Sequence, residues 1–240
     1  MIADIGTVMW KERKGLFRFR GSRGRFLLTM LSPLVLAVVF PWQFGIDWVS
    51  TMMPLILAFI VPAILVGLTV PDSFAGERER HTLQTLLASR LPDQAILWGK
   101  LAVSLVFGWG VTLLVLLTSL VVVNVAHWQG HVLLFTLPIG LGSLGLSLLT
   151  SLLAGGLGVL MSLRSETVQE AAQKLMMFFL VPPILLQVVV MLMRDQLNEV
   201  INSINGPQLL VIVIAVLLVL DVIIMLLATR SFQRSRLVLL

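Results

Sequence analysis

The chain has 240 residues, of which 58% are hydrophobic and 12% are charged, and its mean hydropathy is +1.01. A water-soluble domain carries about twice this share of charged residues, so the composition excludes that class and predicts an integral membrane protein. The chain has no cysteine, which excludes disulfides and thiolate metal sites. The net charge of +5 is spread along the flanks of apolar segments and forms no separate basic patch, so we expect no nucleic-acid binding.

Residues 1–25 are predicted to form a cytoplasmic helix that lies in the membrane surface. Ile2, Ile5 and Val8 recur at helical spacing, and Trp10 and Phe17 stand among lysines and arginines. Such a helix turns its bases toward lipid phosphates and its aromatic rings toward the acyl chains. The lipid bilayer is therefore a predicted partner of this segment.

The sequence after residue 25 predicts six transmembrane helices. The expected fold is therefore all-α, with residues 1–240 in a single domain. Each apolar run reaches or nearly reaches the roughly 20 residues that a membrane-spanning helix needs, and none shows the alternation of a barrel strand. Prolines 54, 62, 138, 182 and 183 predict kinks inside these helices. The predicted spans are about 26–46, 48–71, 95–126, 132–163, 172–193 and 207–229.

The positive charges predict the orientation of these spans. All of the 17 lysines and arginines except Arg194 flank the spans on one face. Because such residues remain on the cytoplasmic side, we expect both termini in the cytoplasm and the chain in the plasma membrane.

Two intramembrane features invite separate interpretations. The fourth predicted span carries small residues at a spacing of four, which favours close helix packing or a dimer interface; they are Ser143, Ser147, Ser151 and Gly155. Asp221 is the one acid inside a predicted span. Buried intramembrane acids usually face protein or water, so Asp221 is either a structural contact within the bundle or part of a pathway.

A cytoplasmic segment between the second and third spans, about residues 74–91, is predicted to form a short amphipathic helix. Leu83, Leu86, Leu87 and Leu91 share one helical face, and polar side chains cover the other. Such a helix suits either a groove on a partner protein or the lipid surface. Spacing alone leaves both interpretations open.

The run Glu77–Ser89, followed by Ile96–Lys100, resembles the signature of type-2 ATP-binding-cassette exporter permeases. His81 departs from the pattern where this family often has glycine, and Gln84 where it often has glutamate. The resemblance implies that residues 74–91 are a coupling helix that contacts an ATPase subunit. The positions that match are Glu77, Arg78, Glu79, Thr82, Leu83, Leu86 and Leu87, together with Gly99 and Lys100.

The same resemblance implies a permease subunit of an ABC exporter that forms the substrate pathway as a dimer with a second, identical or homologous permease half. The chain lacks a phosphate-binding P-loop, so ATP and Mg are expected on separate ATPase subunits, with no cofactor and no enzymatic activity in this chain. The histidines are not spaced as metal ligands, so no metal site is expected. The alternatives are an ATP-independent channel or secondary transporter, and a membrane scaffold protein.

Overall fold

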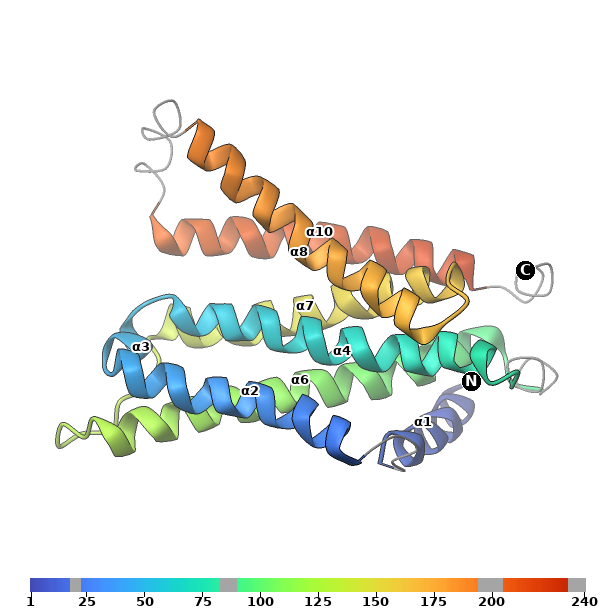
Figure 1. Cartoon of the computed structure of the whole chain (residues 1–240), viewed down its shortest axis with the longest axis horizontal. Coiled ribbons are helices and arrows are strands. Elements are labelled where there is room, and N and C mark those ends of the chain that lie inside the picture. The colour runs from blue at the N-terminus through green and yellow to red at the C-terminus, as the bar shows by residue number, and fades with distance from the viewer. Residues whose placement is uncertain (18–22, 83–89, 194–204, 233–240) are drawn as a thin grey trace.

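The computed structural model describes residues 1–17, 23–82, 90–193 and 205–232, and all regular secondary structure in these ranges is helical. The helices pack side by side as a bundle, with the short α1 lying across one end (Figure 1). They are α1 (Ile2–Phe17), α2 (Arg23–Phe44), α3 (Asp47–Ser50), α4 (Met53–Glu79), α6 (Asp93–Ala126), α7 (Leu137–Leu163), α8 (Val168–Leu192) and α10 (Gly206–Ser231).

Five of these helices are long and apolar enough to cross a membrane, namely α4, α6, α7, α8 and α10. The predictions of an all-helical fold and a multi-pass membrane protein are therefore confirmed. The first predicted span corresponds to α2, a helix of 22 residues whose described apolar part, Leu31–Phe44, is shorter than a full span. The count of six spans remains a prediction.

Prolines fix two helix starts that the sequence interpretation placed inside spans. Pro54 and Pro138 lie in the first turns of α4 and α7, so the kinks predicted at these two positions are wrong. A proline is tolerated in a first turn because the N–H that it lacks would have no helical partner there. The predicted span 48–71 consequently divides into α3 and α4, and α7 begins at Leu137, later than the predicted residue 132.

Helix α4 lies at the centre of the bundle, where it packs against α6, α7 and α8. Its Val66 and Val70 are fully buried and share a core with Leu101 of α6 and Leu175 of α8. Helix α10 packs mainly on α7, while most side chains of α8 and α10 are exposed. Figure 1 shows the second half of α8 diverging from its neighbours. These exposed surfaces are apolar, as surfaces that face lipid must be.

One end of the bundle brings together the segments that carry most of the polar contacts. Helix α1, the end of α4, and the starts of α6 and α8 all lie at this end (Figure 1). The end of α10 lies there as well. Ion pairs and side-chain bonds join several of these segments, so this end holds the candidate site.

Candidate functional site

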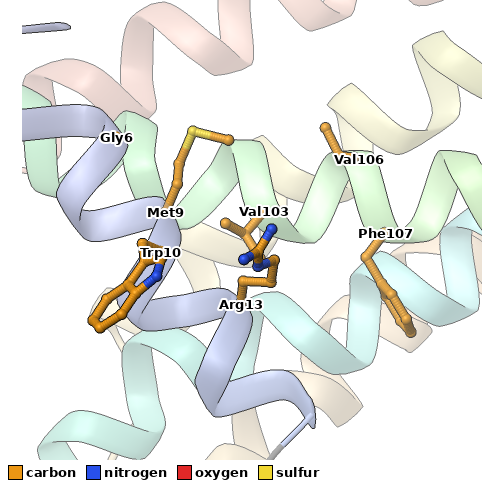
Figure 2. Close-up of a pocket in the computed structure, with 7 residues that line it drawn as sticks. All are labelled: Gly6, Met9, Trp10, Arg13, Val103, Val106 and Phe107. Carbon is orange, nitrogen blue, oxygen red and sulfur yellow. The ribbon is translucent and has the colours of Figure 1, made fainter. Parts of the chain in front are cut away.

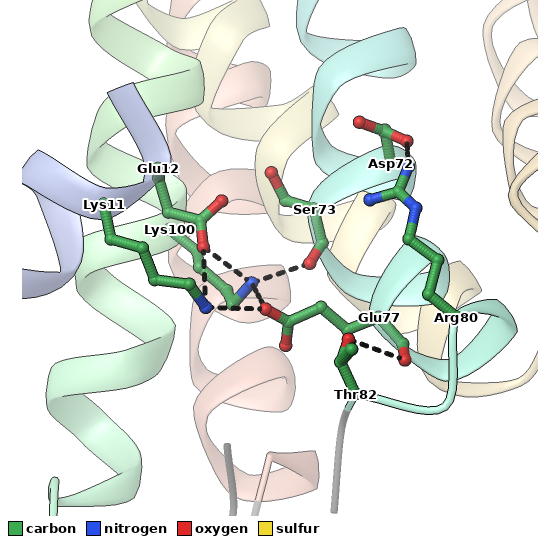
Figure 3. A network of polar contacts seen from close by, with 8 residues as sticks. All are labelled: Lys11, Glu12, Asp72, Ser73, Glu77, Arg80, Thr82 and Lys100. Carbon is green, nitrogen blue, oxygen red and sulfur yellow. Dashed lines mark hydrogen bonds and ion pairs between the residues drawn. The ribbon is translucent and has the colours of Figure 1, made fainter. Parts of the chain in front are cut away.

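A buried lysine stands at the centre of the polar end of the bundle. Lys100, in the second turn of α6, has a side chain that is only 2% exposed. Its Nζ lies 3.0 Å from Oε1 of Glu12 and 2.9 Å from Oε1 of Glu77, and it donates a hydrogen bond of 2.7 Å to the carbonyl oxygen of Ser73 (Figure 3). A buried ammonium group needs this degree of compensation, because an unpaired charge is costly to remove from water.

Lys11 completes the charge balance of this cluster. Its Nζ lies 3.2 Å from Oε1 of Glu77 and 3.9 Å from Oε1 of Glu12. Two lysines thus face two glutamates, and the cluster is formally neutral. The four residues belong to α1, α4 and α6 (Figure 3), so the cluster joins α1 to two long helices of the bundle. We call Lys11, Glu12, Glu77 and Lys100 the ion cluster.

Gly99 allows α1 to approach α6 closely enough to form the ion cluster. A Cβ at Gly99 would lie 2.6 Å from the Cβ of Val8 and 3.3 Å from the carbonyl oxygen of Ile5. Real Cβ atoms do not approach this closely, so any larger residue would separate the two helices. Val8 is 3% exposed as a result of this contact. Gly99 and Lys100 therefore act together. Gly99 leaves room for α1 beside α6, and Lys100 binds Glu12 of α1.

Arg78 and Glu79 join the end of α4 to the next two helices. Nη1 of Arg78 donates to the carbonyl oxygens of Leu163, at 3.3 Å, and Ser165, at 3.2 Å. Leu163 ends α7, where a cation is favourable because the helix dipole is negative there. Oε2 of Glu79 accepts a bond of 3.0 Å from the backbone N–H of Val168, which begins α8, where an acid is favourable. Consecutive residues of α4 thus reach different neighbours.

Helix α4 ends in a Schellman motif whose key position is a histidine. The N–H of Thr82 donates to the carbonyl of Glu77 at 2.9 Å, and the N–H of His81 donates to that of Arg78 at 3.0 Å. His81 has φ of +56°, in the left-handed region that glycine usually occupies in this motif. The departure from the family pattern noted in the sequence therefore falls at the position where glycine has a physical advantage.

The predicted coupling helix, about 74–91, is divided by this turn. Residues 74–79 continue α4, and Asp72 is bound to Arg80 at 2.6 Å across the last turns (Figure 3). Glu77 is half of a buried intramolecular pair, so its carboxylate is directed at this chain. The predicted contact residues Leu83, Leu86 and Leu87 lie outside the described residues.

The sequence matches the model of a known protein family over most of its length. A family model described as "ABC-2 type transporter" matches residues 3–202, which include every residue of the ion cluster. The chain belongs to the ABC-2 type transporter family. No curated protein matches the chain. As a membrane domain of this family it is a transporter permease, and such domains are generally non-catalytic.

In this ABC-2 permease, the small residues of α7 pack within the chain. Ser143, Ser147 and Ser151 are at most 1% exposed. Nε1 of Trp109 in α6 donates a bond of 3.1 Å to Oγ of Ser147. A Cβ at Gly155 would lie 3.1 Å from Leu105, also in α6. Helix packing thus accounts for these residues, and their alternative role at a dimer interface remains a prediction.

Asp221 lies on the face of α10 that packs against α7. It is 5% exposed and shares this face with the buried Leu217, Ile224 and Ala228. Neither of its carboxylate oxygens has a hydrogen-bond partner among the residues that the structure describes. Asp221 therefore lies in the contact between α10 and α7. Its role, structural contact or pathway residue, stays open as predicted.

Sequence reasoning missed Lys11, Glu12 and Ser73 as parts of the site. Glu12 lies 88 positions before Lys100, so no local pattern connects them. One signal was available, because Lys100 lies inside the predicted span 95–126 and an intramembrane cation requires a counter-charge. The candidates for that partner were the acidic residues of segments 1–25 and 72–79, which were predicted on the same side of the membrane as Lys100.

Proposed function

We propose that this chain is the permease half of an ATP-driven exporter, and that the segment after α4 couples it to separate ATPase subunits. Two permease halves, identical or homologous, enclose the substrate pathway. ATP and Mg bind to the ATPase subunits, and this chain supplies the pathway and the mechanical connection. In this proposal the chain crosses the plasma membrane six times, with α2 as the first span, so that both termini lie on the same side, the cytoplasmic one.

The contacts of three consecutive residues at the end of α4 carry this proposal. Glu77 binds residues of α1 and α6, Arg78 binds the end of α7, and Glu79 binds the start of α8. The predicted coupling segment begins directly after this point. A displacement of that segment is therefore transmitted to several helices together, which is the property that a mechanical coupling element requires.

The distribution of charge supports the proposed orientation. Lys11, Arg78, Lys100 and Lys174 belong to segments at one end of the bundle (Figure 1). Lys and Arg concentrate on the cytoplasmic side of membrane proteins. Trp98 and Trp128 flank the membrane-crossing part of α6 and are 37% and 61% exposed. Tryptophans prefer both interfaces of the bilayer, so α6 has the form of a complete crossing.

The experiment that tests the assignment is purification of the tagged full chain in mild detergent, with identification of bound proteins and an assay of ATP hydrolysis. A variant with Leu83→Asp, Leu86→Asp and Leu87→Asp places charges on the predicted apolar face. Gln84→Asp, on the predicted polar face, is the matched control. We expect an ATP-binding-cassette ATPase to copurify with the wild type and the control, and to be lost from the triple variant.

A second variant separates binding of the ATPase from transmission of force. Arg78→Gln with Glu79→Gln removes the charges that hold α4 to α7 and α8. We expect this variant to retain the ATPase but to lose transport in reconstituted vesicles. If the ATPase is lost too, Arg78 and Glu79 are contact residues as the sequence predicted. If no ATPase binds the wild type, the coupling proposal fails, and a channel or a scaffold becomes the better interpretation.

A further inference from the structure

A groove lies between the surface helix α1 and the membrane-crossing helix α6. Its volume is about 540 Å³. Met9, Trp10 and Arg13 line it from α1 (Figure 2). The other wall is apolar and belongs to α6; it consists of Val103, Val106 and Phe107 (Figure 2). We call this site the α1/α6 groove.

The depth of the groove corresponds to the boundary between headgroups and acyl chains. Val106 follows Lys100 of the ion cluster by six residues, or about 9 Å along the helix axis. The α6 wall therefore extends from the polar end of the bundle toward the hydrocarbon. Val106 is 65% exposed and Trp10 is 56% exposed. The groove is thus open to molecules within the bilayer.

Arg13 gives this apolar groove a positive end. It is the charged residue of the lining, its side chain is exposed, and it forms no ion pair with any residue that the structure describes. The neighbouring acid in the sequence, Glu12, is already engaged, because it pairs with Lys100. A guanidinium group binds phosphate oxygens in a bidentate manner, so an anion is the complementary ligand.

We propose that the α1/α6 groove binds an anionic phospholipid of the surrounding leaflet, with its phosphate on Arg13 and an acyl chain along Val103, Val106 and Phe107. The ligand needs an apolar chain for the α6 wall and a headgroup of net negative charge for the cation at the α1 end, and an anionic phospholipid supplies both. The bound lipid holds α1 against α6 beside the ion cluster. This binding requires neither an ATPase nor transport, so it stands apart from the proposed function.

Two glycines of α1 provide a matched test of the groove. A Cβ at Gly6 or at Gly15 would meet no atom within 4 Å, so both positions accept a side chain. Gly6 lines the groove and Gly15 does not. Gly6→Leu therefore fills the groove, and Gly15→Leu adds the same side chain to the same helix elsewhere. Arg13→Gln removes the positive end, and Arg230→Gln, at an exposed arginine in the last turn of α10 that does not line the groove, is its charge control.

The experiment is native mass spectrometry of the purified full chain, incubated with either phosphatidylglycerol or phosphatidylcholine of identical acyl chains. We expect the wild type, Gly15→Leu and Arg230→Gln to retain phosphatidylglycerol preferentially. Gly6→Leu loses retention of both lipids. Arg13→Gln loses the preference by roughly fivefold, the factor that one cation near an anionic surface supplies.

Three outcomes overturn the proposal. Equal retention by Gly6→Leu and the wild type shows that the lipid binds elsewhere. Equal losses in Gly6→Leu and Gly15→Leu, or in Arg13→Gln and Arg230→Gln, show a diffuse surface effect. A protein that copurifies with the wild type and is displaced by Gly6→Leu, with lipid retention unchanged, makes the groove a protein-binding site. Should Gly6→Leu fail to fold, the exposed pair Arg13→Gln and Arg230→Gln still decides the headgroup contact.

Discussion

Nζ of Lys100 lies 2.9 Å from Oε1 of Glu77, and this pair joins the start of α6 to the end of α4. Lys100→Met leaves the carboxylates of Glu77 and Glu12 largely buried with reduced compensation. Removing one partner of a buried pair costs about 3–5 kcal/mol, so we expect a loss of this order in the free energy of unfolding. Thermal unfolding in detergent, followed by tryptophan fluorescence, measures it.

Lys11→Met is the control for this change. Lys11 contacts the same carboxylate, but its side chain is 57% exposed, and solvent screens an exposed ion pair. Its removal should cost less than about 1 kcal/mol. Adding Glu77→Gln to Lys100→Met should restore part of the lost stability, because it removes an uncompensated charge. Equal effects of the two lysine variants would show that burial of Lys100 is unimportant.

The left-handed backbone of His81 predicts a stabilising substitution. A non-glycine residue with φ of +56° is strained by its Cβ, and His81→Gly should raise the free energy of unfolding by roughly 1 kcal/mol. His81→Val should lower it, because a branched Cβ fits this region worst. Asn, which tolerates the left-handed region, should fall between Gly and Val. A denaturant series on the purified variants gives the order, and a neutral His81→Gly variant would contradict the strain.

The main helices could be predicted from the sequence, because each apolar run is about long enough to cross a membrane and contains few charged residues. The positions where helices begin could not, since Pro54 and Pro138 permit either a kink or a first turn. The choice between a kink and a first turn depends on tertiary packing. Trp48, which precedes α4, is 1% exposed in the core, and this burial favours a separate helix α3. Apolar periodicity carries no information about such packing.

Only part of the candidate site could be predicted from the sequence, because the rest also depends on tertiary packing. The motif identified Glu77, Gly99 and Lys100, but the sequence interpretation directed Glu77 at an ATPase. Within the chain, the partners of Glu77 are Lys100, 23 positions later, and Lys11, 66 positions earlier. These pairs exist because α1 returns across the end of the bundle. That return depends on the small volume of Gly99, which spacing alone does not reveal.

Gly99→Val is expected to release α1 from α6. The new Cβ would lie 2.6 Å from the Cβ of Val8. Because a Cβ is bonded directly to the backbone, the Cβ of Val8 cannot move aside unless α1 moves. Because the chain has no cysteine, Val8→Cys introduces a single thiol whose maleimide labelling reports exposure. The rate should rise strongly with Gly99→Val. Gly110→Val, also in α6 but with no atom within 4 Å of the new Cβ, should leave it unchanged, and equal rates in both would disprove the role of Gly99.

Asp221→Leu is expected to stabilise the purified chain. The carboxylate is buried without a hydrogen-bond partner in the described part of the chain, and burial of such a group costs about 1–3 kcal/mol on mutational scales. A leucine extends the apolar face of α10 that packs on α7. Val222→Leu, at the exposed neighbouring position, should change little. A clear loss of stability in Asp221→Leu alone would show that the carboxylate makes a stabilising contact in the purified chain.

The function of Asp221 needs a milder substitution. Asp221→Asn keeps the size of the side chain and removes its charge. Loss of transport with normal assembly would place Asp221 in the pathway. Unchanged assembly and transport would exclude a pathway role and leave the structural one.

Two glycines of α7 should respond in opposite directions to the same substitution. A Cβ at Gly156 would lie 2.6 Å from Cγ2 of Ile224 in α10, whereas a Cβ at Gly145 would meet Ile214 of α10 at 3.9 Å. Gly156→Ala therefore forces α7 and α10 apart and should cost about 1–3 kcal/mol. Gly145→Ala gains up to about 1 kcal/mol of helix propensity at an ordinary contact distance. Unfolding midpoints of the two variants compare them directly, and an unchanged or raised midpoint in Gly156→Ala would show that the α7–α10 contact does not depend on Gly156.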